Sequence, residues 1–142
     1  MSKLDRNRGF SLTELLLVLA IIGILSSIAI PQFLGQRRRA RVIGDAQSNA
    51  RVLAMALEGR KAENGIYGTG GPYTWTVAAG ASDATFLPAV SLQGTSNMNY
   101  SIAITNGGLA YTITVTDPSM ANANVLTLNQ MGTLSLDATY NK

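Results

Sequence analysis

The feature that most limits how this chain can fold is an apolar run without a charged side chain over residues 15–36. A helix rises about 1.5 Å per residue, so about 20 apolar residues suffice to cross a hydrocarbon core about 30 Å thick. The run therefore predicts a helix that can span a membrane. One acid, Glu14, lies at its N-terminal rim, four residues after Phe10. Such an ionisable group is a candidate for function, although Glu14 can also be a headgroup-level acid on an ordinary anchor.

The composition limits the chemistry that the chain can perform. It has 142 residues and contains neither Cys nor His. This excludes disulfide bonds, thiolate nucleophiles and Cys or His metal sites, and it removes the usual general base. About 80 residues remain for a head, whose small core must lean on another element. We therefore expect no catalytic residues, no cofactor and no metal site in a protein that is not an enzyme.

The net charge of +3 is unevenly distributed along the chain. The leader and residues 37–61 carry most of the cations, whereas only Lys142 follows Lys61. The acids beyond Lys61 are Glu63, Asp83, Asp117 and Asp137. The head is therefore mildly acidic, and we do not expect nucleic acid as a partner.

The residues around Glu14 form a specific motif. Residues 9–14 read GFSLTE and lead into the aliphatic run up to Pro31. In an ordinary secretory signal the small residue at the cleavage site follows the apolar region, whereas Gly9 precedes it. The segment resembles the type IV prepilin signature, which type IV pilins share with the pseudopilins of type II secretion. Thr13 is a small departure, because an aliphatic residue is more usual there.

This resemblance implies how the protein is processed and assembled. A prepilin peptidase and N-methyltransferase would cut after Gly9 and methylate the new amine of Phe10. The subunit would wait among the lipids of the inner membrane until an assembly platform and its ATPase-driven machinery extract it into a homopolymeric filament. We expect a structural subunit of an extracellular type IV pilus. The alternatives are a pseudopilin in a periplasmic pseudopilus and a minor pilin with an adhesin or DNA-binding role.

In such a filament, the cost of burying an unpaired carboxylate predicts a cationic partner for Glu14. An unpaired carboxylate in a water-poor bundle of helices is costly, and the nearest available cation is the amine of a neighbouring subunit's Phe10. At about 4 Å and an effective dielectric constant of about 20, the attraction is about 4 kcal/mol before desolvation is subtracted. The first helical turn also favours a negative charge through the helix dipole. We expect Glu14 and Phe10 to set the register between subunits.

A basic collar follows the apolar run at Arg37, Arg38, Arg39 and Arg41. It can face water, contact anionic lipid headgroups, or meet acidic groups of neighbouring heads in the filament. A solvated or headgroup-facing collar is favoured, because runs of charge usually face water. Counting cations alone would place the collar in the cytoplasm, whereas the prepilin resemblance places Met1 there.

Pro31 interrupts an otherwise helical pattern. Proline removes a backbone donor and crowds the carbonyl four residues earlier, so we expect a kink or local unwinding between Gly23 and Pro31. In the prepilin family this stretch can melt in the assembled filament. A simple bend with no mechanical role is the alternative. Ser26 and Ser27 are candidates to bond the carbonyls that proline frees.

The second half of the helix is predicted to be amphipathic. Its apolar positions recur at helical spacing: Val42 or Ile43, Ala46, Ala50, Leu53 or Ala54, and Leu57. Asn49 is placed among the polar positions on the other faces. The helix is expected to end around residues 63–65, with Gly65 as a left-handed cap.

The head is predicted to be a loop region followed by a small antiparallel sheet. Glycines and prolines punctuate residues 65–97, and Tyr67, Tyr73, Trp75, Phe86 and Leu87 are its expected anchors. Because such a connection is long, part of it is expected to form a short helix or strand whose place the pattern does not give. Alternating residues flank the turns at 106–108 and 130–132, which predicts two hairpins and about four strands within residues 98–137. Asp117, Asn122 and Asn124 can offer oxygens to a cation, but a polar loop is the preferred interpretation.

The sequence thus predicts an α+β fold, with a long N-terminal helix packed on a small antiparallel sheet as in pilins. Its parts are a leader (1–9), a membrane-spanning or filament-core helix (10–36), an amphipathic stem helix (37–64) and a head (65–142).

Overall fold

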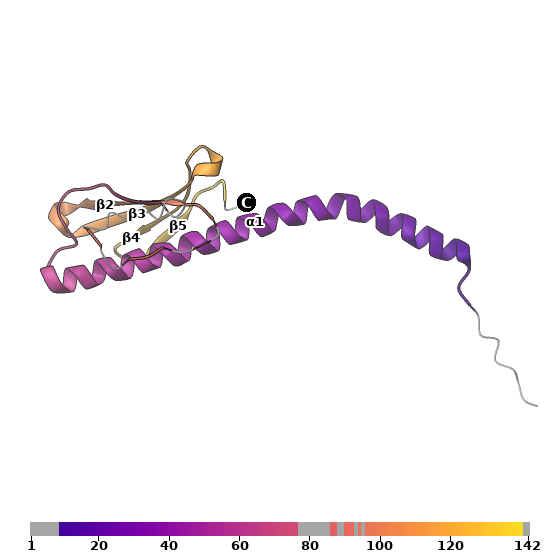
Figure 1. The fold of residues 1–142 in the computed structure, drawn as a ribbon, viewed down its shortest axis with the longest axis horizontal. Coiled ribbons are helices and arrows are strands. Elements are labelled where there is room, and N and C mark those ends of the chain that lie inside the picture. The colour runs from indigo at the N-terminus through magenta and orange to yellow at the C-terminus, as the bar shows by residue number, and fades with distance from the viewer. Residues whose placement is uncertain (1–8, 77–85, 88–89, 93, 95, 141–142) are drawn as a thin grey trace, which may run out of the picture. The chain divides into compact units, whose positions relative to one another are not determined.

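The structure is a computed structural model that describes residues 9–76, 86–87, 90–92, 94 and 96–140. The chain divides into two compact units, Met1–Arg38 and Arg39–Lys142. One helix, α1 (Leu12–Asn64), contributes to both units. The second unit adds an antiparallel sheet to its part of α1, so the fold is the expected α+β arrangement (Figure 1).

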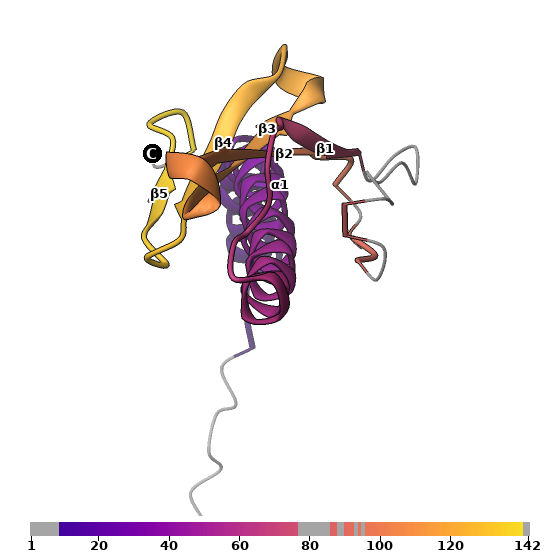
Figure 2. The same cartoon turned by 90° about the vertical axis from the view of Figure 1, so that its left-hand side faces the viewer.

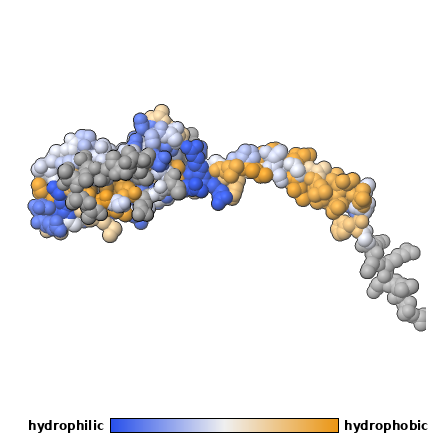
Figure 3. Space-filling model, in the orientation of Figure 1, coloured by the Kyte–Doolittle hydropathy of each residue, from blue (hydrophilic) through white to orange (hydrophobic). Residues whose placement is uncertain are grey.

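The first unit contains the apolar part of α1. Its large aliphatic side chains are exposed, as the hydrophobic colour of this helical segment shows (Figure 3). Among the described residues, α1 is long and apolar enough to cross a membrane. The helix continues through Pro31, so the stretch from Gly23 to Pro31 is helical in the single subunit. The carbonyl that Pro31 leaves without its helical donor belongs to Ser27, four residues earlier. The hydroxyl of Ser27 donates to a different carbonyl, that of Ile24 (2.8 Å).

The second unit uses one face of α1 as the base of its core. The buried helix positions are Val42, Ala46, Asn49, Ala50, Leu53 and Leu57. The helical pattern left open whether Val42 or Ile43, and Leu53 or Ala54, lies on the buried face. The structure buries Val42 and Leu53. Gly65 follows the helix with a φ of 79°, and its N–H donates to the carbonyl of Lys61 (2.8 Å). This confirms the predicted left-handed cap.

Within the described residues, five strands form one antiparallel sheet in the order β1-β2-β3-β4-β5. They are β1 (Tyr73–Thr76), β2 (Asn99–Thr105), β3 (Ala110–Asp117), β4 (Ala123–Asn129) and β5 (Leu134–Leu136). Figure 2 shows the sheet lying on one side of α1. The two predicted hairpins are β2–β3 and β4–β5, and a third hairpin joins β3 to β4.

The sheet has one strand that the sequence pattern did not place. β1 is the short element expected within the long connection after the helix, and it pairs with β2 so that Trp75 lies opposite Tyr100. Both aromatic side chains are buried. The prediction of about four strands was therefore one strand short, because a strand of only four residues gives little alternation to read.

Close backbone packing fixes the turn between β2 and β3. Gly108 has a φ of 92°, and a Cβ there would lie 2.6 Å from the carbonyl oxygen of Gly68. The N–H of Tyr67 donates to the carbonyl of Gly108 (2.8 Å), which ties the segment after the helix to this turn. Only glycine satisfies both the conformation and the contact.

Candidate assembly site

The N-terminus of α1 is organised by a half-formed capping box. Ser11 is the N-cap, because its carbonyl accepts the N–H of Leu15 (3.2 Å). Glu14, three residues later, reaches back and accepts the backbone N–H of Ser11 (2.9 Å). The hydroxyl of Ser11 bonds the hydroxyl of Thr13 (2.7 Å). The Ser-x-x-Glu spacing is the known signature of such a cap, so this contact could have been predicted from the sequence.

Gly9 and Phe10 precede the helix and are both exposed. The side chain of Phe10 has 89% of its surface exposed. A Cβ on Gly9 would have no neighbour within 4 Å. The peptide bond between these two residues therefore lies in an accessible, non-helical segment, as a processing site requires.

The contact with Ser11 leaves Glu14 available for further bonds. A carboxylate has about four lone-pair positions, and the cap uses one of them. A cation that approaches the exposed end of the helix can use another. An amine on Phe10 would arise only by cleavage, and the predicted pair involves the Phe10 of another subunit. The single chain brings Glu14 together with Ser11, and the pairing with Phe10 stays a prediction.

The four arginines of the basic collar are all exposed on α1. The guanidinium of Arg37 lies 5.7 Å from the ring centroid of Phe33, a weak cation–π contact at an exposed position. Exposure in a single chain is compatible with water, lipid headgroups or neighbouring heads as the surroundings of the collar, so the choice among them stays a prediction.

A polar cluster secures the end of the stem helix inside the second unit. The hydroxyl of Tyr67 donates to Glu58 (2.8 Å), and the ammonium of Lys61 donates to Tyr67 (3.4 Å). The rings of Tyr67 and Tyr111 meet edge to face at 4.7 Å. Burial, together with the nearby carboxylate of Glu58, raises the pKa of Tyr111 to about 12. Burial also raises the pKa of Tyr67.

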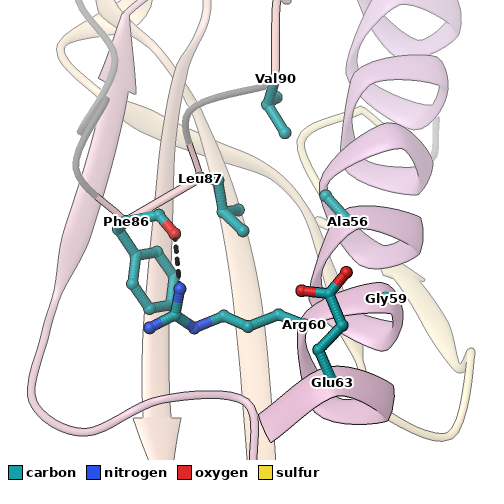
Figure 4. Close-up of a pocket in the computed structure, with 7 residues that line it drawn as sticks. All are labelled: Ala56, Gly59, Arg60, Glu63, Phe86, Leu87 and Val90. Carbon is teal, nitrogen blue, oxygen red and sulfur yellow. Dashed lines mark hydrogen bonds between the residues drawn. The ribbon is translucent and has the colours of Figure 1, made fainter.

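Arg60 connects the stem to the segment that contains Phe86. Its guanidinium donates to the backbone carbonyl of Phe86 (2.9 Å) and lies 4.6 Å from the centroid of the Phe86 ring (Figure 4). The groove beside this contact has a volume of about 340 Å³. Its lining residues are Ala56, Gly59, Arg60, Glu63, Phe86, Leu87 and Val90. The predicted anchors Tyr67, Trp75, Phe86 and Leu87 are buried, whereas Tyr73 is half-buried.

Asn49 corrects one assignment made from the sequence. We placed it among the polar positions outside the buried face, but its side chain is 4% exposed. Its amide donates to the hydroxyl of Tyr100 (2.9 Å). The hydrogen bond satisfies both groups inside the core, which is why a polar residue is tolerated on the buried face.

Asp117 forms a buried contact that sequence reasoning missed. Its carboxylate accepts the backbone N–H and hydroxyl of Ser119 (2.8 and 2.6 Å) and the hydroxyl of Tyr140 (2.9 Å). Asp117 and Tyr140 are only 3% and 6% exposed. The contact joins the C-terminal segment to the end of β3, in accord with the preferred interpretation of a polar loop. No periodicity links two residues so far apart in the chain.

The comparisons with known proteins bear on the N-terminal segment. The family model described as the prokaryotic N-terminal methylation motif matches residues 4–30. The match covers less than a fifth of the chain and is consistent with the type IV prepilin signature expected from the sequence. Residues 9–14, which carry the candidate site, lie inside this match.

Relatives that match part of the chain include both pilins and secretion-system proteins. The Type IV major pilin protein PilA of Myxococcus xanthus is 36% identical over 98 residues, 61% of this chain and 44% of the relative. The Type II secretion system core protein G of Escherichia coli is 36% identical over 69 residues, 49% of this chain and 47% of the relative. A Type IV major fimbrial protein FimA of Dichelobacter nodosus is 30% identical over 102 residues, 69% of this chain and 65% of the relative.

The chain spans about half the length of the first two of these relatives. None of the three is named as an enzyme. No solved structure matches the chain.

Proposed function

We propose that this protein is a structural subunit of a type IV pilus, cleaved after Gly9 and polymerised through its N-terminal helix. The observation that carries the proposal is the exposed apolar part of α1, directly preceded by an accessible prepilin-type motif. A membrane can cover such a helix in the waiting subunit, and neighbouring helices can cover it in a filament. The prokaryotic methylation motif supports N-methylation of Phe10 by the same processing enzyme.

The same motif supports the route to the filament. The subunit waits in the inner membrane, and an assembly platform with its ATPase-driven machinery moves it into an extracellular homopolymer. In the filament, Glu14 pairs with the amine of a neighbouring Phe10. The stretch from Gly23 to Pro31 bends or melts, because Pro31 leaves one carbonyl without its helical donor. The basic collar at residues 37–41 lies at the lipid headgroups before extraction.

A pseudopilin of type II secretion is the second candidate, because protein G of Escherichia coli has the same percentage identity as PilA. Two pilus proteins, PilA and a FimA, align over 98 and 102 residues, whereas protein G aligns over 69. These two long alignments support the pilus, but length alone does not separate the two classes, because two further fimbrial relatives align over only 65 and 61 residues.

Shearing surface filaments from the organism that encodes this chain, and identifying their main subunit by mass spectrometry, tests the proposal. We expect this chain as the dominant component, and filaments should be missing from a strain that lacks its gene. Filaments made of another subunit, with this chain required for protein secretion, would establish the pseudopilin instead.

A further inference from the structure

Two asparagines in the chain are followed directly by glycine, and the structure places them in opposite surroundings. One pair is Asn64 with Gly65, at the end of α1, and the other is Asn106 with Gly107, in the turn between β2 and β3. The side-chain amide of an asparagine can be attacked by the backbone nitrogen of the next residue. Glycine hinders this attack least, because it has no side chain and turns freely about its backbone bonds. The two pairs therefore share one intrinsic reactivity and differ in how the fold holds their reacting atoms.

In the first pair both reacting groups are held by hydrogen bonds. The N–H of Gly65, which would supply the attacking nitrogen, donates to the carbonyl of Lys61 (2.8 Å). The side-chain amide of Asn64 donates to the carbonyl of Arg60 (3.1 Å). Attack at Asn64 therefore requires both bonds to open and the last turn of α1 to unwind.

The second pair lies in an open turn. Asn106 and Gly107 are both exposed, and no group in the described part of the chain bonds the N–H of Gly107 or the side chain of Asn106. A Cβ built on Gly107 would meet no atom within 4 Å, so the attacking nitrogen has space around it. The peptide group between the two residues is held by one bond, in which the carbonyl of Asn106 accepts the N–H of Leu109 (3.2 Å). Rotating this peptide group into position for attack thus costs one long hydrogen bond at the surface.

From this contrast we propose that Asn106 is a site of spontaneous modification, at which its side-chain amide is lost and an aspartyl or isoaspartyl residue remains. The nitrogen of Gly107 gives its proton to a base in the solvent and attacks Cγ of Asn106. The bond from Cγ to Nδ2 breaks, ammonia leaves, and a succinimide ring forms. Water opens the ring at one of its two carbonyls. The product is aspartate, or isoaspartate when the main chain then runs through Cγ.

The modification changes the turn in charge and in length. Either product adds one negative charge to a head that has few charged residues, and isoaspartate also adds one carbon to the main chain. The neighbouring Gly108 has little room to adjust, because its carbonyl accepts the N–H of Tyr67 (2.8 Å) and a Cβ on it would lie 2.6 Å from the carbonyl oxygen of Gly68. We therefore expect isoaspartate to weaken the tie between this turn and the segment that follows the helix.

Incubation of the full chain in detergent micelles at mildly alkaline pH tests the selectivity. Chymotryptic peptides separate Asn64 from Asn106, and mass spectrometry measures the conversion of each. In the folded protein we expect Asn106 to react at least about tenfold faster than Asn64, because the helix end must first open. In urea, where both pairs lose their folded surroundings, the two rates should agree within about twofold. The rate at Asn106 should rise with pH, because the attacking nitrogen must lose its proton.

Variants assign the product to one residue. An isoaspartate methyltransferase with a labelled methyl donor detects isoaspartate directly. Asn106→Gly keeps a residue that accepts the positive φ of 53° at this position, and it should remove most of the label. Asn64→Gln, the matched control, should leave the label unchanged. After equal ageing, the unchanged protein should unfold at a lower urea concentration than Asn106→Gly.

The proposal is overturned by equal conversion of the two asparagines in the folded protein, by conversion of Asn106 only in urea, or by full label in Asn106→Gly. Equal unfolding midpoints of the aged unchanged protein and the aged Asn106→Gly variant would overturn the effect on the turn. Each of these results concerns the single subunit, so none of them bears on the proposed pilus function.

Discussion

Glu14 has one contact in the single subunit and a second one in the proposed filament, and the two can be separated by a conservative change. Glu14→Gln keeps an oxygen that can accept the N–H of Ser11, and it removes the charge. If the ion pair with a neighbouring Phe10 sets the register, we expect about tenfold fewer filaments at a normal level of membrane-inserted subunit. Counting surface filaments by electron microscopy measures this.

Glu14→Leu is the companion variant, because it removes both the charge and the capping oxygen. We expect it to insert stably in the membrane and to assemble as poorly as Glu14→Gln. Normal filament numbers in Glu14→Gln, with a loss only in Glu14→Leu, would show that Glu14 acts as a helix cap and would refute the pairing.

The contact between Asp117 and Tyr140 predicts a specific loss of stability. Tyr140→Phe deletes the hydroxyl that donates to a buried carboxylate, so we expect about 1.5–3 kcal/mol less free energy of unfolding. Urea unfolding followed by the fluorescence of Trp75, the single tryptophan, provides the measurement. Tyr73→Phe removes an exposed hydroxyl bond to Thr69 and should lose under about 1 kcal/mol. Equal losses in the two variants would argue against the importance of the buried contact.

Tyr111 predicts how stability changes at high pH. Burial raises its pKa from an ordinary value of about 10 to about 12, so its hydroxyl stays protonated in the folded state while that of the unfolded chain ionises. This contribution is complete below pH 10 and is lost as the pH rises to about 12. In Tyr111→Phe, the free energy of unfolding should therefore fall less steeply over this interval. An identical slope in the variant and the unchanged protein would contradict the assignment.

At the scale of elements, the stem helix packs through one narrow face. Leu53 is fully buried, whereas Met55, two residues further on, is 74% exposed. Leu53→Ala should reduce the free energy of unfolding by about 2–5 kcal/mol, because it leaves a cavity against the sheet. Met55→Ala should change it by less than about 0.5 kcal/mol. Chemical unfolding of both variants checks this, and a comparable loss in Met55→Ala would mean that the wrong face had been assigned to the core.

Periodicity is what made the long elements predictable. The helical spacing of Ala46, Ala50 and Leu57 and the alternation in β3 report a buried face directly, and both were confirmed. Residues that depend on a distant partner gave no such signal. Asn49 looks polar in sequence, and only its bond to Tyr100 explains its burial. β1 is too short for alternation to show, and its pairing with β2 defines it.

At the candidate site, the local features could be predicted from the sequence, whereas a contact between subunits could not be examined in one chain. The motif at residues 9–14 predicts a processing site after Gly9, and the position of an acid beside an apolar run singles out Glu14. The cap between Ser11 and Glu14 could also have been predicted from the Ser-x-x-Glu spacing. The pairing of Glu14 with another subunit could not be resolved by a single chain, since the proposed partner atom belongs to a second copy.

At the scale of the whole molecule, the chain combines a helix whose apolar side chains must be shielded from water with a head that has few charged residues. The apolar part of α1 is exposed, and a membrane or neighbouring helices must shield it from water. The cations lie mainly in the leader and stem, and the chain after Lys61 carries only five charged residues, Glu63, Asp83, Asp117, Asp137 and Lys142. This division suits a subunit whose helices form the interior of a polymer and whose heads form its surface.

The most direct test of the account is the mass of the N-terminal peptide of this chain, isolated from sheared surface filaments. The proposal predicts a subunit that begins at Phe10 and carries one methyl group on its amine. A chain that retains residues 1–9, or one that occurs only in the membrane fraction while filaments are abundant, would contradict it.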